Sequence, residues 1–401
     1  MNILIWNECY VAGGADWSLI DLVLHWPNSE DTFVLYINNS HEGLELLKEK
    51  MPSNVEVREF ESIMEFTETV TLNRFFKHRL IKKLVLALSI PINYFVYKRE
   101  ISGNNFDALL MNNGGYPGGL TNFMVAFAAQ SLGIKKRMMI VRNYPPYHSS
   151  KNIIMRLSDW VSNKSLNKMV AVSNSLSDSI KSKTSIDTDL IDVIYNGVSV
   201  ENKISDDNDG IQVSFEKGLS VGIIGTLQER KGHQFLFKSW VQVIKEFEKA
   251  RLYIVASKSS GDKNKLILLA KELGIAHSIV WIDFTRNVGD IYKQLDVVVM
   301  PSLEYESFGR IIVESMAFSI PIIATKVGGM PELINHGKDG FLVEKNDDDA
   351  LASQIIDLLK NPEMRKSVGA EGFNMYSTKF TADIMSNNYC RLLHELKQYK
   401  Q

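Results

Sequence analysis

The sequence predicts an α/β fold made of two doubly wound domains, each with a parallel sheet. Short apolar runs typical of buried strands alternate with helical patterns along the chain, and this order is how parallel sheets are built. The length of 401 residues exceeds the usual size of one hydrophobic core. Two domains are therefore expected.

The alternation starts at the first residues. Residues 2–6 are predicted to form a strand, and a helix is expected from about Asp16 to His25. Between them, Gly13 and Gly14 either form a plain turn or let the backbone approach a ligand. Asp16 is either the N-cap of the helix or a contact to an acceptor. Further strands and helices of this half are expected at 32–37, 43–49, 55–60, 108–111, 119–132, 136–141, 169–173 and 193–197.

The most informative segment is 297–345. An apolar run at 297–300 predicts a buried strand, and a helix is expected from about residue 308 to 318 with Ser307 as its N-cap. A helix N-terminus binds anions through its unpaired N–H groups. Glu306 lies just before that end, and Glu314 lies further along the helix on the side of Arg310. Two carboxylates flanking a phosphate site suit a nucleotide sugar, because they can accept hydrogen bonds from hydroxyls on either side of the phosphates.

The stretch from Glu306 to Glu314, ESFGRIIVE, resembles the Glu–x7–Glu motif of retaining glycosyltransferases. The whole segment resembles glycosyltransferase family 4, which has the GT-B fold. This resemblance implies two Rossmann-like doubly wound domains facing each other across a cleft. The expected boundaries are 1–199 for an acceptor-side domain, 200–380 for a nucleotide-sugar domain, and 381–401 for a helix that crosses back to the first domain.

The resemblance also implies roles for residues of the second domain. Glu306 would contact the hydroxyls of the donor sugar, and Glu314 would hold the ribose diol. Lys231 would grip the diphosphate, and Arg230 beside it can replace the arginine that the family has at Thr226. With Glu306, these two cations are the predicted catalytic residues. The remaining predicted donor contacts are Gly13, Gly14, Gly225, Thr226, Phe284, Thr285, Arg286, Ser307, Phe308, Gly309 and Arg310.

The acceptor side is expected near Arg142 and Asn143, which follow a predicted strand of the first domain. The family often has a histidine in this region. Here Arg142 occupies the position nearest the strand, and His148 comes later. His148 is therefore read either as a loop residue beside prolines or as an acceptor-side group, together with Asp16.

Charge is distributed unevenly along the chain. Residues 1–70 hold 3 basic and 13 acidic residues, whereas residues 71–183 hold 17 basic and 4 acidic ones. Within 71–99 there is no acid, and basic residues alternate with Phe75, Phe76 and Leu84. Two readings stay open for 71–88: peripheral contact with an anionic membrane, or a solvated helix that packs its apolar face on the sheet.

Composition excludes several classes of protein. A net charge of −2 gives no reason to expect a nucleic-acid partner. Two cysteines, Cys9 and Cys390, make no disulfide framework, which fits a reducing cytoplasm, where the protein could lie at the inner face of the plasma membrane. The acidic groups at 187–189 and 347–349 read as a polar loop and a helix cap, so no metal is expected. Residues 84–97 form the longest apolar run, which is too short for a membrane span.

These observations predict a retaining glycosyltransferase that moves a hexosyl or N-acetylhexosaminyl group from a nucleoside diphosphate sugar, with UDP as the expected nucleotide. The acceptor would be a hydroxyl of a glycan or of a lipid-linked molecule in cell-surface glycan synthesis. No cofactor is expected besides the donor substrate. Two alternatives remain, a non-hydrolysing sugar-nucleotide epimerase and an inactive scaffold subunit with the same fold.

Overall fold

The computed structural model contains two compact units. The first consists of Met1–Tyr195 together with Asp383–Gln401, and the second of Asn196–Ala382. The side chains of residues 79–88 and 154 are not described within this structure, although their backbone is. The structure describes residues 1–7, 12–61, 79–117, 123–145, 153–200, 215–256, 262–283 and 288–396.

The first unit is built on a seven-stranded parallel sheet with the order β3-β2-β1-β4-β5-β6-β7. Its strands are rich in Ile, Leu, Val and Met and are largely buried, as expected for a sheet covered on both faces. Trp6 lies at its centre and packs against Tyr36, Phe60 and Tyr97. The strands are β1 (Asn2–Asn7), β2 (Thr32–Asn38), β3 (Val55–Phe60), β4 (Ala108–Asn113), β5 (Lys136–Val141), β6 (Lys168–Ala171) and β7 (Ile191–Val193).

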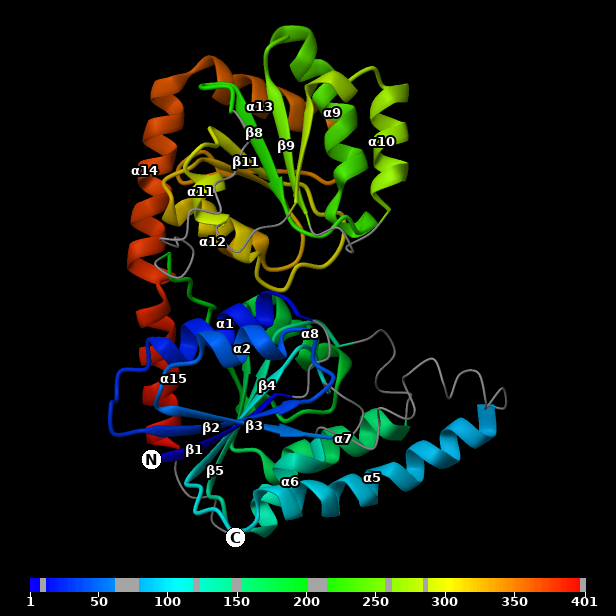
Figure 1. The fold of residues 1–401 in the computed structure, drawn as a ribbon, viewed down its shortest axis with the longest axis vertical. Coiled ribbons are helices and arrows are strands. Elements are labelled where there is room, and N and C mark those ends of the chain that lie inside the picture. The colour runs from blue at the N-terminus through cyan, green and yellow to red at the C-terminus, as the bar shows by residue number, and fades with distance from the viewer. Residues whose placement is uncertain are drawn as a thin grey trace. The chain divides into compact units, whose positions relative to one another are not determined.

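Helices cover both faces of this sheet. The helices α1 (Gly14–Leu24) and α2 (Leu44–Lys50) lie on one face, while α5 (Arg79–Ile101), α6 (Phe123–Ser131) and α7 (Ile153–Ser165) lie on the other (Figure 1). This division follows from right-handed crossovers, because the strand order changes direction after β3. The short helix η2 (Thr188–Leu190) and α8 (Asn174–Lys183) complete the unit's N-terminal segment.

The second unit has a six-stranded parallel sheet with the order β10-β9-β8-β11-β12-β13. Its strands are β8 (Ser220–Ile224), β9 (Arg251–Ala256), β10 (Ile279–Asp283), β11 (Val297–Met300), β12 (Ile322–Thr325) and β13 (Phe341–Val343). Its helices are α9 (His233–Glu246), α10 (Lys263–Glu272), α11 (Val288–Tyr292), α12 (Arg310–Ala317), α13 (Asp348–Lys360) and α14 (Pro362–Lys379), with single turns η4 (Glu229–Lys231), η5 (Ala276–Ser278) and η6 (Met330–Glu332). Two α/β domains of Rossmann type were predicted, and this part of the prediction is confirmed.

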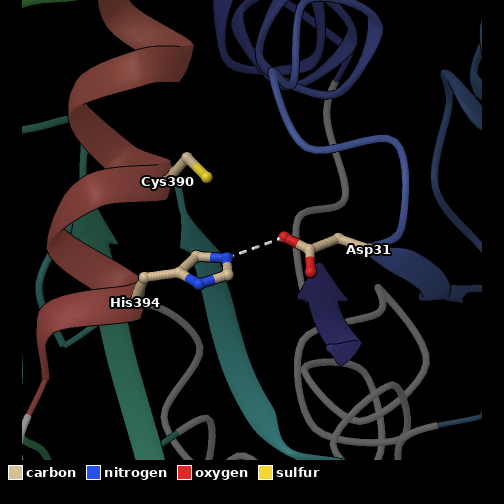
Figure 2. A group of neighbouring side chains, drawn as sticks. All are labelled: Asp31, Cys390 and His394. Carbon is tan, nitrogen blue, oxygen red and sulfur yellow. Dashed lines mark hydrogen bonds and ion pairs between the residues drawn. The ribbon is translucent and has the colours of Figure 1, made fainter.

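The last helix, α15 (Ala382–Glu395), packs on the first unit. The hydroxyl of Ser386 donates to the carbonyl of Leu22 at 2.9 Å. His394 Nε2 lies 2.9 Å from Asp31 Oδ2 (Figure 2). Asp31 also accepts hydrogen bonds from the N-terminal amine and from the Trp26 indole, so one buried carboxylate joins the helix to both segments.

Candidate donor-binding site

Both sheets have a topological switch point, where the strand order changes direction. It lies between β1 and β4 in the first sheet and between β8 and β11 in the second. In doubly wound folds, ligands bind beyond the carboxyl ends of the strands at such a point. Most predicted donor contacts follow β8 or β11, at the switch point of the second sheet.

The loop after β8 is held against the end of β11 by a glycine. Gly232 has φ +75°, a conformation that L residues rarely adopt, and a Cβ there would collide with the carbonyl of Pro301. The Leu303 amide donates to the Arg230 carbonyl at 2.8 Å. These close approaches fix Arg230 and Lys231 beside the loop that follows β11.

Glu306 brings the predicted catalytic residues together. Its Oε1 accepts from Arg230 Nη1 at 2.9 Å and also from Lys231 Nζ. The Ser302 hydroxyl lies 3.4 Å from the same oxygen. Oε2 has no hydrogen-bond partner among the described residues and stays available for a ligand. One half-buried carboxylate therefore lies beside two cations at the switch point.

Glu314 is buried deeper and is bound on both oxygens. Arg310 Nε donates to Oε1 at 2.9 Å, and the Tyr292 hydroxyl donates to Oε2 at 2.9 Å. Burial and the neighbouring negative charge raise the pKa of Tyr292 well above its usual value, so it stays protonated and remains a donor. The Tyr292 ring stacks on Phe318 with a centroid distance of 5.2 Å. Glu314 is therefore an acceptor fixed by two donors, whereas Glu306 Oε2 has no partner among the described residues.

The start of α12 differs from the prediction. The N-cap is Gly309, with φ +86°, and no side chain caps the helix, so the prediction of Ser307 as N-cap was wrong. The reason is that residue 309 has a positive φ and the helix begins only after it, at Arg310. Glycine adopts a positive φ without strain, whereas serine does not. A helix start with a glycine N-cap and no side-chain capping bond is the kind of N-terminus at which anions bind. The predicted residue Phe308 is buried, and its ring packs edge-on against Phe380.

Two further residues of the β8–α9 segment have buried polar atoms without a partner in the described part of the chain. Gly225 has φ +145° and leads into Thr226, whose Oγ1 makes no hydrogen bond. His233 opens α9, and neither of its ring nitrogens has a hydrogen bond. Burial and the charge of Lys231 lower the pKa of His233 to about 4. The sequence analysis missed His233. Its position directly after Lys231 and Gly232, two residues of a predicted phosphate-binding loop, was the signal that could have identified it.

In the first unit, Gly13 and Asp16 belong to a tight loop at the start of α1. Gly13 is the N-cap and Asp16 is the third helical residue, so the alternative that made Asp16 the N-cap was wrong. Asp16 is buried, and its Oδ2 accepts from the Gly13 amide at 2.8 Å. Its Oδ1 lies 3.2 Å from His41 Nε2, without the angle of a hydrogen bond. The ring of His41 is oriented by the Gly43 amide, which donates to Nδ1 at 2.8 Å.

Arg142 ends a row of polar side chains at the switch point of the first sheet. Arg142 Nε donates to Asn112 Oδ1 at 2.8 Å, and Asn112 Nδ2 donates to Asn7 Oδ1 at 2.9 Å. These residues lie at the carboxyl ends of β5, β4 and β1, which are neighbours in the sheet. Asn143 is exposed next to Arg142. The sequence analysis missed Asn7 and Asn112. Each asparagine stands at the end of an apolar run, which is the signal that could have identified them.

Several predicted residues lie outside the described part of the chain. These are His148 on the acceptor side and, on the donor side, Phe284, Thr285 and Arg286. Of the basic stretch 71–88, the structure describes only the backbone of 79–88, as the beginning of α5. Their predicted roles stay predictions.

One group of possible metal ligands occurs among the described residues, and it lies away from the switch points. Asp31, Cys390 and His394 offer ligand atoms within 4.8 Å of one another (Figure 2). Asp31 already accepts from Met1, Asn28, Trp26 and His394, which uses the four acceptor positions of a carboxylate. This group therefore acts as a junction between α15 and the start of β2.

A model of a known family matches residues of the second unit. Residues 205–375 match the model of the family described as glycosyl transferases group 1. The matched segment lies within the second unit and contains Lys231, Glu306 and Glu314, the residues that carry the predicted donor site.

Curated relatives of the chain include two bacterial enzymes. The N-acetyl-alpha-D-glucosaminyl L-malate synthase of Bacillus anthracis is 26% identical over 211 residues, which cover 51% of this chain and 54% of the relative. The capsular polysaccharide biosynthesis glycosyltransferase CapM of Staphylococcus aureus is 25% identical over 289 residues, covering 69% and 74%. The chain thus spans about half the length of the first relative and about three quarters of the second.

Solved structures match the whole chain and show that its fold is GT-B. Anabaena Alr3699/HepE, solved in complex with UDP and glucose, has a TM-score of 0.74 and 19% identity, covering 98% of this chain and 99% of that one. TarM of S. aureus, solved with UDP among its ligands, has a TM-score of 0.72 and 12% identity over 98% and 100%. In the described part of the chain, no helix has the length and apolar character that a membrane span requires.

Proposed function

We propose that the protein is a retaining glycosyltransferase of family 4 that transfers a hexosyl or N-acetylhexosaminyl group from a UDP-sugar to an acceptor hydroxyl in cell-surface glycan synthesis. The observation that carries the proposal is the junction of Arg230, Lys231 and Glu306 at the β8–β11 switch point. Such a junction would place two cations beside the leaving diphosphate, which supports the proposal. The names of two relatives, an N-acetyl-alpha-D-glucosaminyl L-malate synthase and a capsular polysaccharide biosynthesis glycosyltransferase, support transfer to a small or a polymeric acceptor.

The chemistry follows from where charge develops. As the bond from the sugar to the diphosphate breaks, negative charge grows on the phosphate oxygens and positive charge on the sugar ring. Lys231, Arg230 and the N-terminus of α12 would stabilise the phosphate charge. The carboxylate of Glu306 would orient the sugar through its hydroxyls, and an oxygen of the departing phosphate would take the proton of the acceptor. No protein nucleophile is assigned.

Binding of the diphosphate requires a change in the Glu306 ion pair. In the present structure both cations bind this carboxylate. A diphosphate would compete for Lys231 and Arg230, and Glu306 would then turn its oxygens to the sugar. Glu314, already fixed by Arg310 and Tyr292, would keep its position and accept a hydrogen bond from a ribose hydroxyl.

The acceptor belongs to the same proposal. A glycan or a lipid-linked molecule would approach from the row of Arg142, Asn112 and Asn7 at the switch point of the first sheet. Contact with the inner face of a membrane through residues 71–88, and hence a cytoplasmic location beside that membrane, remain proposals motivated by the basic, acid-free sequence.

The test is to measure nucleoside diphosphate release from candidate donors, with and without acceptor. A transferase releases the nucleotide rapidly only when the acceptor is present, and the product keeps the anomeric configuration of the donor. An epimerase converts the donor without any acceptor. A scaffold subunit gives neither reaction with any donor, and this outcome would overturn the proposal.

A further inference from the structure

A buried pair of side chains joins the start of α1 to the loop between β2 and α2. Asp16 lies in the first turn of α1, and His41 lies in that loop. The two helices lie on the same face of the first sheet (Figure 1). His41 Nε2 lies 3.2 Å from Asp16 Oδ1, and both side chains are at most 1% exposed. The pair is therefore closed to a ligand and acts only through the segments that it joins.

The Gly43 amide determines which nitrogen of His41 carries the ring proton. This amide donates to Nδ1 at 2.8 Å, so Nδ1 has no proton and the proton of the neutral ring is on Nε2. The Nε2–H group then faces the Asp16 carboxylate, whose other oxygen accepts from the Gly13 amide at 2.8 Å. Through these two side chains, the backbone at Gly13 is tied to the backbone at Gly43.

The β2–α2 loop is shaped to hold the His41 ring. The His41 amide donates to the Asn38 carbonyl at 3.0 Å, and the Leu44 amide donates to the His41 carbonyl at 3.0 Å. An added Cβ at Gly43 would lie 2.9 Å from His41 Cε1. The φ of Gly43 is −97°, which any residue adopts, so this glycine serves to leave room for the ring.

Gly13 is a glycine that the described fold does not require. Its φ of −176° is extended backbone, and an added Cβ would meet no atom of the described residues within 4 Å. It is also the N-cap of α1, and no side chain caps this helix. An uncapped helix start beside a residue without a side chain is the kind of N-terminus at which anions bind. A rigid buried support behind such a start keeps its N–H groups in one place.

We propose that His41 is a positioning residue that acts through Asp16 and holds the Gly13–Gly14 segment in place for the donor phosphates. The inference rests on the proposed function, which supplies this ligand. Negative charge grows on the phosphate oxygens as the sugar leaves, so amides aimed at them act mainly in the transition state. A misplacement of about 1 Å costs up to about 100-fold in rate. Loss of the Nε2 donor should therefore lower kcat more than it raises KM.

The test compares two substitutions of His41 in the whole protein. In His41→Asn the side-chain carbonyl can still accept from the Gly43 amide, as in an Asx turn, but the side chain is too short to reach Asp16. In His41→Gln the longer amide can donate to Asp16. We expect kcat to fall about tenfold in His41→Asn, with KM changed by less than about threefold, and to stay within about threefold of the wild type in His41→Gln. Amide hydrogen exchange at residues 12–16 should be faster in His41→Asn alone.

The matched control for lost stability is Val161→Ala, which opens a cavity under α7, on the opposite face of the sheet. This variant should have a lower melting temperature and an unchanged kcat. A double-variant cycle tests whether His41 acts through Asp16. Adding His41→Asn to Asp16→Asn should lower kcat little further, because the link is already broken.

The outcomes separate this inference from the proposed function. If the wild type transfers sugar and His41→Asn keeps its kcat as Val161→Ala does, or if the losses from Asp16→Asn and His41→Asn multiply, the inference is overturned. If the wild type transfers no sugar from any donor, the proposed function fails, and hydrogen exchange alone decides whether His41 holds the segment. Equal exchange at residues 12–16 in wild type and His41→Asn overturns the inference in either case.

Discussion

Glu306 and Glu314 are held in different ways, and this difference predicts different kinetic effects. One oxygen of Glu306 accepts from two cations and the other has no hydrogen-bond partner among the described residues, whereas each oxygen of Glu314 accepts from a different side chain. The sugar changes charge and shape in the transition state, and the ribose does not. Contacts that strengthen only in the transition state govern kcat, whereas uniform contacts govern KM.

Glu306→Gln is therefore expected to lower kcat by about 100-fold or more, since such electrostatic contacts are worth roughly 3 kcal/mol. It should leave the affinity for the free nucleoside diphosphate unchanged or increase it, because Lys231 and Arg230 lose their carboxylate partner. Steady-state kinetics and calorimetric titration of the diphosphate measure both effects. A large loss of diphosphate affinity in this variant would show that the ligand is placed wrongly.

Glu314→Gln is expected to raise the KM for the donor about tenfold, which corresponds to a loss of ~1.4 kcal/mol of binding free energy. It should weaken binding of the free nucleoside diphosphate by a similar factor. The matched control is Tyr292→Phe, which removes one hydrogen bond to Glu314 and keeps the ring stacked on Phe318. That control should show a smaller rise in KM in the same assay. If Glu314→Gln changes kcat alone, its assignment to the ribose fails.

His233 predicts a pH dependence of stability. Its pKa is about 4 in the folded protein against 6.5 for an ordinary histidine, because burial and Lys231 disfavour the charged ring. Between these values the unfolded chain binds the proton and the folded chain does not, so stability falls as pH drops from about 6.5 to about 4. The full effect is about 3 kcal/mol. Urea unfolding of wild type and His233→Asn over this range measures it, and equal pH slopes in the two proteins would contradict it.

At the scale of elements, the β8–α9 loop depends on a single glycine. Gly232→Ala would place a Cβ against the Pro301 carbonyl at positive φ, and we expect a loss of stability on the order of 3 kcal/mol. Gly274→Ala is the matched control, because Gly274 also has positive φ but no atom within 4 Å of an added Cβ. Its cost should be about 1 kcal/mol. Similar melting temperatures for both variants would show that the contact between residue 232 and the Pro301 carbonyl does not limit stability.

The sequence predicted the elements of the donor site better than their contacts. The β11–α12–β12 segment was recognisable because its apolar runs, Pro301 and the two glutamates are close together in the chain. The N-cap was placed wrongly because capping preferences favour Ser307 over a glycine that reverses the backbone at positive φ. The ion pair between Glu306 and Arg230 could not be predicted either, because it depends on the contact between two loops that are 76 positions apart in the chain.

At the scale of the whole molecule, the parallel order of both sheets followed from the alternation of strands and helices. The row of Asn7, Asn112 and Arg142 could not be predicted in this way, because it depends on the pairing of β1 with β4 and of β4 with β5. Local patterns do not contain this pairing. His41 was missed for the same reason, since its partner Asp16 lies on another element.

The fixed positive charges of the donor site predict turnover without a divalent metal. Lys231, Arg230 and the start of α12 would take the role that a metal has at the leaving phosphate in other enzymes. Transfer rates with and without EDTA should therefore agree within about twofold. Loss of activity in EDTA that Mg²⁺ or Mn²⁺ restores would contradict this expectation.

The central claim is that a nucleoside diphosphate binds at the β8–β11 switch point, and a thermal-shift panel tests it most directly. UDP, GDP and ADP are added to the wild type and to Lys231→Ala, with Lys360→Ala, at the end of α13, as a control for loss of an exposed lysine. One diphosphate, expected to be UDP, should raise the melting temperature of the wild type and the control. At 100 times its dissociation constant the ligand contributes about 2.7 kcal/mol. Lys231→Ala should lose this shift. The account is contradicted if no diphosphate raises the melting temperature, or if Lys231→Ala responds as the wild type does.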